Sequence, residues 1–238
     1  MPRFFINTIP GEDTVISGED GRHIAKSLRM QPGEVITLCD GQGHDYFGEI
    51  TEISGETVGV HITEMQASKS EPSIKVTLCQ GVPKSDKMDL IVQKAVELGV
   101  WRIVPTVTSR CISRPDEKSA HKKVQRWQKI AQEAAKQSGR GIIPQVTEFT
   151  ALKQACKDAS GKRVLFYEGG GERIPVVITE LDTDITVYIG PEGGFAAEEV
   201  QLIQDAGGFA ATLGPRILRT ETAPLAALAA IMLVTNNL

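Results

Sequence analysis

Two glycine-containing segments near the end of the chain have the residue types best suited to holding a ligand. Residues 189–195 read IGPEGGF, and residues 213–225 read LGPRILRTETAPL. Glycine lets a ligand approach the main chain closely. The first segment lacks the lysine and Ser/Thr of a phosphate loop and the G-x-G-x-x-G of a dinucleotide fold. These segments predict a site of exposed peptide groups, in which Glu192 favours a cationic ligand.

The polar residues of the second segment add charged groups but also have a plainer explanation. Arg219 and Glu221 stand beside a predicted helix start, where polar groups can face a cleft. Thr220 or Thr222 can cap that helix, with Pro224 in its first turn, and capping is the better explanation for these threonines alone. Two such loops at the carboxyl ends of strands are, however, where an open α/β sheet binds ligands.

The middle of the chain carries a stripe of basic residues. A helix predicted at about 117–138 has an apolar face and, roughly opposite, cations at steps of three, four or seven. Like charges four residues apart cost a few tenths of a kcal/mol each, so helix stability does not require them. A solvated face is the common explanation, but the long stripe favours contact with phosphates. Its members are Lys118, Lys122, Arg126, Lys129, Lys136 and Arg140, and the preceding helix adds Lys84, Lys87 and Lys94.

Charge is distributed unevenly along the 238 residues, whose net charge is -4. Residues 1–72 hold 5 Lys and Arg against 12 Asp and Glu, residues 73–145 hold 14 against 6, and residues 146–238 hold 7 against 12. The three parts therefore carry -7, +8 and -5. A basic block between acidic ones indicates that one face meets a polyanion.

The elements that position these residues fall into two patterns. Residues 1–70 read as short strands with one helix near 23–30, and the polar stretch 66–72 reads as a linker. From residue 73 strands alternate with helices, which predicts a parallel α/β sheet. Later strands are expected at 74–79, 101–107, 164–167, 185–189 and 210–213, and helices at 88–98, 117–138, 151–159, 196–206 and from 222 to the end.

Composition narrows the class of protein. At 41% hydrophobic and 24% charged residues, the chain has the balance of an ordinary globular protein. The N-terminal residues do not resemble a signal peptide, and no apolar run approaches the roughly 20 residues of a membrane span. The four cysteines and four histidines show no metal-binding spacing. We therefore expect a cytoplasmic protein with no membrane and no metal partner.

The motifs taken together resemble a known family. GPEGGF followed by LGPRILRTETA is similar to the RsmE family of ribosomal RNA methyltransferases, within the SPOUT superfamily. Residues 93–100 (QKAVELGV) and 133–140 (EAAKQSGR) look like two further family motifs, and the N-terminal residues Arg3, Phe4, Phe5, His23, Leu28 and Arg29 support the match. This resemblance spans nearly the whole chain.

The resemblance implies a fold and an activity. It implies a PUA-like β-barrel at 1–70 that binds RNA, a trefoil-knotted methyltransferase domain with a parallel sheet at 73–238, and a homodimer. The implied reaction moves a methyl group from S-adenosylmethionine to N3 of a uridine in 16S ribosomal RNA of the small ribosomal subunit. The implied cofactor contacts are Tyr167, Glu168, Ile189, Gly190, Glu192, Gly193, Gly194, Leu213, Gly214, Ile217, Leu218 and Thr222.

The reaction suggests which residues act. Methyl transfer from a sulfonium depends on alignment, which can contribute roughly 7–11 kcal/mol. The uracil nitrogen must also lose a proton, so a base or a cation that stabilises the anion is needed. We expect Glu221 as base, with Arg219 and Arg110 holding the anion or a nearby phosphate. The expected RNA contacts are Arg3, Arg29, Lys84, Lys87, Lys122, Arg126, Lys129 and Arg140, mostly in the basic middle because residues 1–72 are acidic.

Two alternatives remain at this point. A non-catalytic RNA-binding protein, such as a ribosome assembly factor, could keep the same fold. A nucleotide-dependent enzyme with an ordinary Rossmann sheet could use residues 164–166 and the following Glu168-Gly-Gly-Gly171 as its loop. The intact GPEGG and RTETA segments count against the first, and triple glycine after a strand is weak support for the second.

Overall fold

The computed structural model describes residues 1–238 and divides them into two compact units. Unit 1 comprises Met1–Glu71 and Ala135–Ile143, and unit 2 comprises Pro72–Ala134 and Pro144–Leu238. The sequence predicted a division near residue 70, but it did not predict that residues 135–143 belong to the same unit as the N-terminal residues. None of the helices is both long and apolar enough to cross a bilayer.

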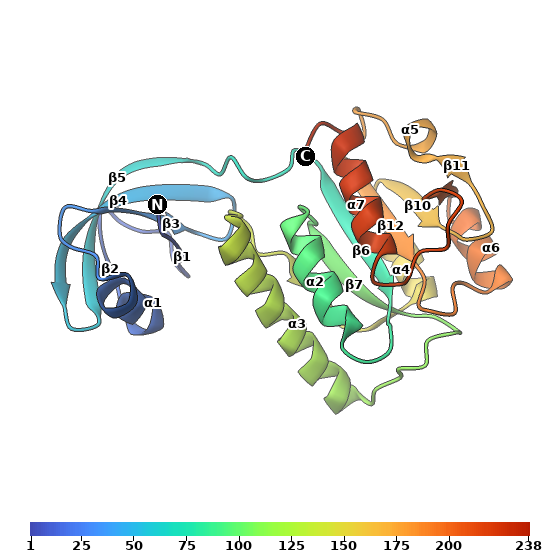
Figure 1. The fold of residues 1–238 in the computed structure, drawn as a ribbon, viewed down its shortest axis with the longest axis horizontal. Coiled ribbons are helices and arrows are strands. Elements are labelled where there is room, and N and C mark those ends of the chain that lie inside the picture. The colour runs from blue at the N-terminus through green and yellow to red at the C-terminus, as the bar shows by residue number, and fades with distance from the viewer. The chain divides into compact units, whose positions relative to one another are not determined.

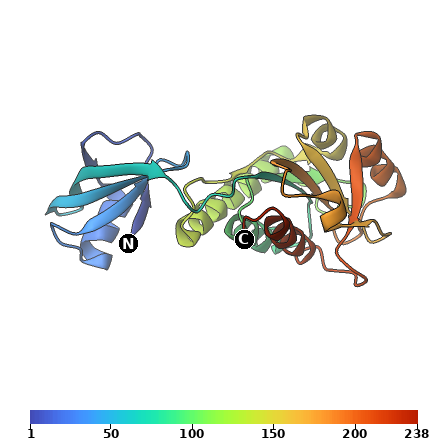
Figure 2. The same cartoon turned by 90° about the horizontal axis from the view of Figure 1, so that it is seen from above.

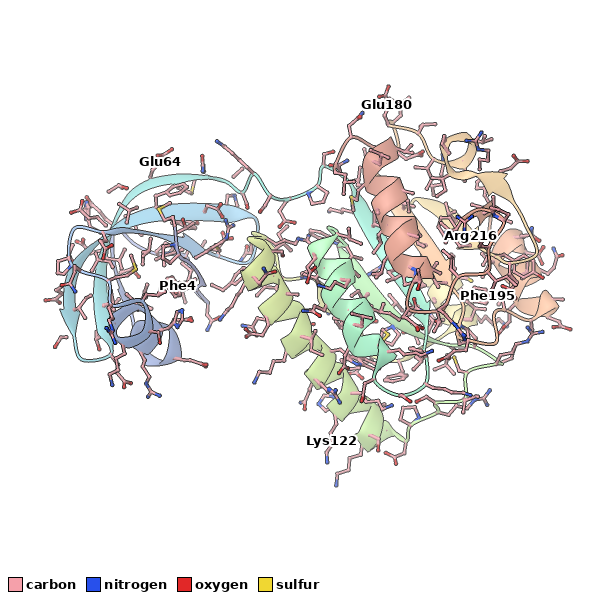
Figure 3. All side chains as sticks on the ribbon, in the orientation of Figure 1. Phe4, Glu64, Lys122, Glu180, Phe195 and Arg216 are labelled. Atoms are coloured by element: carbon pink, nitrogen blue, oxygen red, sulfur yellow. The ribbon has the colours of Figure 1, made fainter.

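Unit 1 is built on a five-stranded sheet in the order β1-β3-β4-β5-β2. Its core is a cluster of buried apolar side chains that includes Phe4, Ile24, Ile36 and Val60; Figure 3 labels Phe4. β1 and β2 stand at opposite ends of the order and do not pair, so hydrogen bonding makes an open sheet where a closed barrel was expected. The strands are β1 (Arg3–Phe5), β2 (Asp13–Ile16), β3 (Val35–Cys39), β4 (His44–Ser54) and β5 (Thr57–Ala67).

Two local predictions for unit 1 need correction. The single helix expected near 23–30 is α1 (Gly18–Arg22) followed by the π-helical turn η1 (His23–Leu28), which ends at Arg29 in a left-handed conformation. The linker expected at 66–72 begins late, because β5 continues pairing with β4 as far as Ala67 opposite His44. The alternation of apolar and polar residues ends before this point in the sequence, although the backbone hydrogen bonds between β4 and β5 continue.

Unit 2 contains an eight-stranded sheet in which every pairing is parallel. The order is β11-β13-β10-β12-β6-β7-β8, with β9 also paired to β7. The strands are β6 (Lys75–Gly81), β7 (Arg102–Val107), β8 (Gln145–Val146), β9 (Thr150–Ala151), β10 (Lys162–Phe166), β11 (Glu172–Arg173), β12 (Asp184–Ile189) and β13 (Gly208–Thr212). The parallel sheet confirms the α/β class expected from strand–helix alternation.

Helices cover both faces of this sheet, as parallel sheets require. α2 packs against α7 on one face, and α4 packs against α6 on the other (Figures 1 and 2). The central strands are consequently buried on both sides: all of Ile185–Ile189 is buried. The helices are α2 (Lys87–Glu97), α3 (Glu117–Ser138), α4 (Leu152–Asp158), α5 (Ile174–Val177), α6 (Ala197–Asp205) and α7 (Ala223–Val234).

Candidate active site

A cavity of about 590 Å³ lies at the carboxyl ends of three neighbouring strands, β10, β12 and β13. Residues 166–168, 189–194 and 212–220 supply most of its wall, with Ala223 beside them. Its size falls within the usual range for small-molecule and cofactor sites. Both glycine-containing segments of the sequence therefore meet at one cavity, at the sheet edge where open α/β folds bind ligands.

The structure places most of the expected cofactor residues on this wall. Among all the expected cofactor residues, Thr222 alone does not line the cavity. Of the three expected catalytic residues, Arg219 lines the cavity. Glu221 lies two residues further along the same segment but does not line it, and Arg110 contacts the lining residue Gly193. The sequence argument missed Phe166 and Thr212, whereas the other lining residues outside the expected set lie inside the two segments already singled out: Pro191, Pro215, Arg216, Thr220 and Ala223. Adjacency to an expected residue was the available signal for Phe166 and Thr212; Figure 3 labels Arg216, which belongs to the segment that follows β13.

Gly194 adopts a backbone that other residues rarely tolerate. Its φ is +65°, in the left-handed region, and a Cβ built on it would overlap Oε1 of Glu168. Gly190 is also tightly packed, since a Cβ there would lie 3.0 Å from the main chain of Gly194. Glycine at these positions thus lets the backbone of this loop lie close both to the cavity and to the neighbouring chain.

Buried hydrogen bonds join the loop after β12 to the segment before α7. The Thr220 hydroxyl donates to the Gly190 carbonyl at 2.9 Å. Gln80, which is fully buried, donates from Nε2 to the Thr220 hydroxyl at 3.2 Å and to the Gly81 carbonyl at 3.0 Å. Thr222 is the N-cap residue of α7, but its side chain makes no capping bond. Of the two threonines, Thr220 therefore fixes the cavity wall.

We expect Thr220→Val to destabilise the protein by about 1–3 kcal/mol, because it removes a buried hydroxyl that both donates and accepts. Denaturant unfolding measures the loss. The matched control is Thr222→Val, which lies on the same segment but is exposed and should stay within roughly 0.5 kcal/mol of the parent. Equal stability of the two variants would show that the Thr220 bonds do not hold the wall.

The segment after β7 braces the loop after β12. Nη1 of Arg110 donates to the Gly193 carbonyl at 2.7 Å. One carboxylate oxygen of Glu199 accepts from the Ser109 N–H at 2.7 Å, and the other accepts from the Ala196 N–H at 2.9 Å. Arg110 is therefore engaged with the main chain of the loop, at a point directly beside the cavity.

One ammonium links two carboxylates at the rim. Nζ of Lys87 lies 3.1 Å from Oε1 of Glu192 and 3.1 Å from Oε2 of Glu221. Hydrogen bonds to these carboxylates, Glu192 first, raise the pKa of Lys87. The pKa of Glu221 is lowered by its own backbone N–H and then by Lys87, against an opposing effect of burial. The three side chains are therefore all charged at neutral pH.

Four members of the expected RNA-binding set form intramolecular ion pairs. Arg140 is buried at 3% exposure and donates to Glu71 from Nη2 at 2.6 Å, so it does not belong to an exposed stripe. Arg3 pairs with Asp45 at 2.5 Å, and Arg126 pairs with Asp89. Lys87 is held as described above. Lys136, another member of the stripe, is half-buried, and its Nζ lies 3.6 Å from Oδ1 of Asp20.

Among the basic residues expected in the stripe or as RNA contacts, fewer are exposed and outside any ion pair than the sequence indicated. They are Arg29, Lys84, Lys118, Lys122 and Lys129. Figure 3 shows Lys122 pointing away from α3. Spacing along the helix located the cations correctly, but it could not show which of them meet a carboxylate from another element.

A family model described as the RNA methyltransferase domain matches residues 69–232, and one described as the RNA methyltransferase PUA domain matches residues 16–63. The chain is 37% identical to the ribosomal RNA small subunit methyltransferase E of Bacillus subtilis, over 94% of this chain and 91% of that protein. The chain belongs to the RsmE family of RNA methyltransferases.

Further members of the RsmE family agree over nearly the full length. The Mycobacterium bovis ribosomal RNA small subunit methyltransferase E is 32% identical, covering 98% of this chain and 92% of that protein. The crystal structure of the Neisseria gonorrhoeae enzyme of the same name, bound to S-adenosyl methionine, matches with a TM-score of 0.86 and 34% identity over 98% of this chain and 97% of that chain. Membership of this family favours the interpretation as an RNA methyltransferase over the interpretation as a nucleotide-dependent Rossmann enzyme.

Proposed function

We propose that this protein transfers a methyl group from S-adenosylmethionine to N3 of a uridine in 16S ribosomal RNA. The observation that carries the proposal is the cavity of about 590 Å³, walled by the main chain of three loops at adjacent strand ends. The N. gonorrhoeae relative, which matches 98% of this chain, is bound to S-adenosyl methionine. N3 of uridine is the specific outcome that the resemblance of the two motifs implies.

The wall suits the chemistry of that cofactor. S-adenosylmethionine supplies an electrophilic methyl group on a positively charged sulfur. Glu168 and Glu192 place carboxylates at the wall, and apolar side chains such as Ile189 and Leu218 offer surface for an adenine ring. Peptide groups exposed by Gly190 and Gly194 can exchange hydrogen bonds with it. The expected set from Tyr167 to Leu218 is thus proposed to hold the cofactor, with Thr222 left out because it does not line the wall.

The chain's own groups account for the remaining needs of the reaction. We assign Glu221, ionised at the rim, as the acceptor of the uracil N3 proton, and Arg219 on the cavity wall as the cation beside the developing anion. Arg110 instead keeps Gly193 in place through its bond to the carbonyl. Alignment by fixed loops then supplies most of the acceleration. Full turnover by Glu221→Gln would remove this residue as the base.

The exposed lysines of α3 are proposed as phosphate contacts. Replacing Lys122 and Lys129 with Glu should weaken binding to small-subunit RNA and flatten its salt dependence by roughly 0.7–0.9 per lost contact. Filter binding at several salt concentrations measures both. The control exchanges Lys153 and Lys157, two exposed lysines of α4, for Glu. A loss of the same size in the control would show a general charge effect and no specific surface.

Homodimerisation is a further part of the proposal. α7 reads APLAALAAIMLV and is apolar on every side, yet Leu233 is 65% exposed and Leu90 on the neighbouring α2 is 43% exposed. A helix that is hydrophobic all round belongs in an interior. We propose that a second copy of this chain covers it, which light scattering would show as a doubled mass. The trefoil knot and a cytoplasmic location remain predictions from the resemblance.

The experiment that tests the proposed function compares ribosomal RNA from a strain with and without this protein. Methylation at N3 blocks Watson–Crick pairing, so reverse transcriptase should stop at the modified uridine in the parent and read through in the deletion strain. Restoring the gene should restore the stop. An unchanged stop pattern, together with cofactor binding by the pure protein, would favour the non-catalytic assembly factor.

A further inference from the structure

Lys87 occupies a position where three separate elements meet. It is the first residue of α2, while Glu192 belongs to the loop after β12 and Glu221 to the turn before α7. Its Nζ lies 3.1 Å from a carboxylate oxygen of each. Glu192 lines the cavity, whereas Lys87 does not. Glu221 does not line it either, so the ammonium joins the wall residue Glu192 to the segment before α7 from outside the wall.

The local structure of α2 does not explain this lysine. A cation at a helix N-terminus faces the positive end of the helix dipole, which disfavours it. The turn that precedes it is also strained: Ser85 has a φ of 55° without being glycine. That turn brings the Lys84 N–H to 3.2 Å from Oε1 of Glu192. Both features run against local preference and serve contacts with Glu192.

We propose that Lys87 is a positioning residue for methyl transfer, which holds Glu192 and Glu221 side by side at the rim of the cavity and keeps Glu221 ready to accept a proton. It acts through the carboxylates and touches neither the cofactor nor the RNA. This inference rests on the proposed function, and it assigns Lys87 a role different from the RNA contact expected from the sequence.

The charges around the cluster define what its loss would do. Glu221 faces Lys87 from α2, Glu192 from the loop after β12, and Arg219 from its own segment. Without the ammonium, the two carboxylates would lose their shared cation, leaving Arg219 near Glu221 and the Lys84 N–H on Glu192. Like charges at close range raise the pKa of one partner. Protonation would then remove the acceptor at a higher pH than in the parent protein.

The test is the pH dependence of methyl transfer to small ribosomal subunits by Lys87→Met and Lys87→Arg. Met removes the charge and keeps an unbranched side chain that is one atom shorter, whereas Arg keeps the charge. For Lys87→Met we expect the acid limb of kcat to move up by about one pH unit. We also expect kcat at neutral pH to fall roughly tenfold to a hundredfold through misplacement of Glu221. KM for the subunit should not change, and Lys87→Arg should recover most of the activity.

A double variant separates positioning from other roles. In a Glu221→Gln background, Lys87→Met should lower kcat no further than about twofold, because the two residues act as one unit. A full additional loss, an unmoved acid limb, or a raised KM for the subunit with a weaker salt dependence would each overturn the inference. Failure of the parent protein to methylate at all would instead refute the proposed function, so the two failures are distinguishable.

Discussion

We expect Gly194→Ala to lose at least about 100-fold in affinity for S-adenosylmethionine, equivalent to roughly 2.7 kcal/mol. Two physical effects combine. Alanine is strained at the φ of +65° that Gly194 adopts, and its Cβ would displace the carboxylate of Glu168 at the cavity wall. Isothermal titration calorimetry on the purified variant measures the affinity.

The control for this variant is Gly170→Ala. Gly170 also has a positive φ, +102°, but a Cβ there meets nothing within 4 Å, and the residue does not line the cavity. It should share the backbone strain and bind S-adenosylmethionine as the parent does. Parent-like affinity in Gly194→Ala would contradict the assignment of this loop to the cofactor.

Arg140→Met should destabilise unit 1 by about 3–5 kcal/mol, since it leaves the mostly buried carboxylate of Glu71 without its charged partner. Glu71 accepts from Arg140 at 2.6 Å and from the N–H groups of Gly141 and Ile142 at 2.8 and 3.1 Å. These bonds tie residues 135–143 to the end of the N-terminal segment within unit 1. Urea unfolding followed by circular dichroism measures the loss.

Lys129→Met is the matched control, because it removes an exposed basic residue of the same predicted stripe. Its stability should stay within roughly 0.5 kcal/mol of the parent. If Arg140→Met were equally mild, the buried pair would not hold unit 1 together and Arg140 could return to the set of RNA contacts.

The sequence predicted the elements that position the site because their signals are local. The apolar runs that became β10, β12 and β13 lay within a few residues of their observed bounds, and α3 begins and ends where the periodicity indicated. The short strands β8, β9 and β11 were missed, because two residues carry no recognisable period. Glycine and proline located both loops of the cavity, because these residues determine the backbone conformation at their own positions.

The contacts between loops could not be predicted in the same way. The bond from Gln80 to Thr220 joins residues 140 positions apart, and Arg140 meets Glu71 across 69 positions. Periodicity shows which face of an element a side chain occupies, but it does not show which distant residue contacts that side chain. The cluster of Lys87, Glu192 and Glu221 was missed for this reason, although all three residues had been singled out individually for other roles.

Calorimetric titration of the purified protein with S-adenosylmethionine, alone and in the presence of small ribosomal subunits, tests the central claim most directly. We predict saturable heat with one cofactor per chain, lost in Gly194→Ala and kept in Gly170→Ala. No heat with the parent protein under either condition would contradict a cofactor site at the ends of β10, β12 and β13.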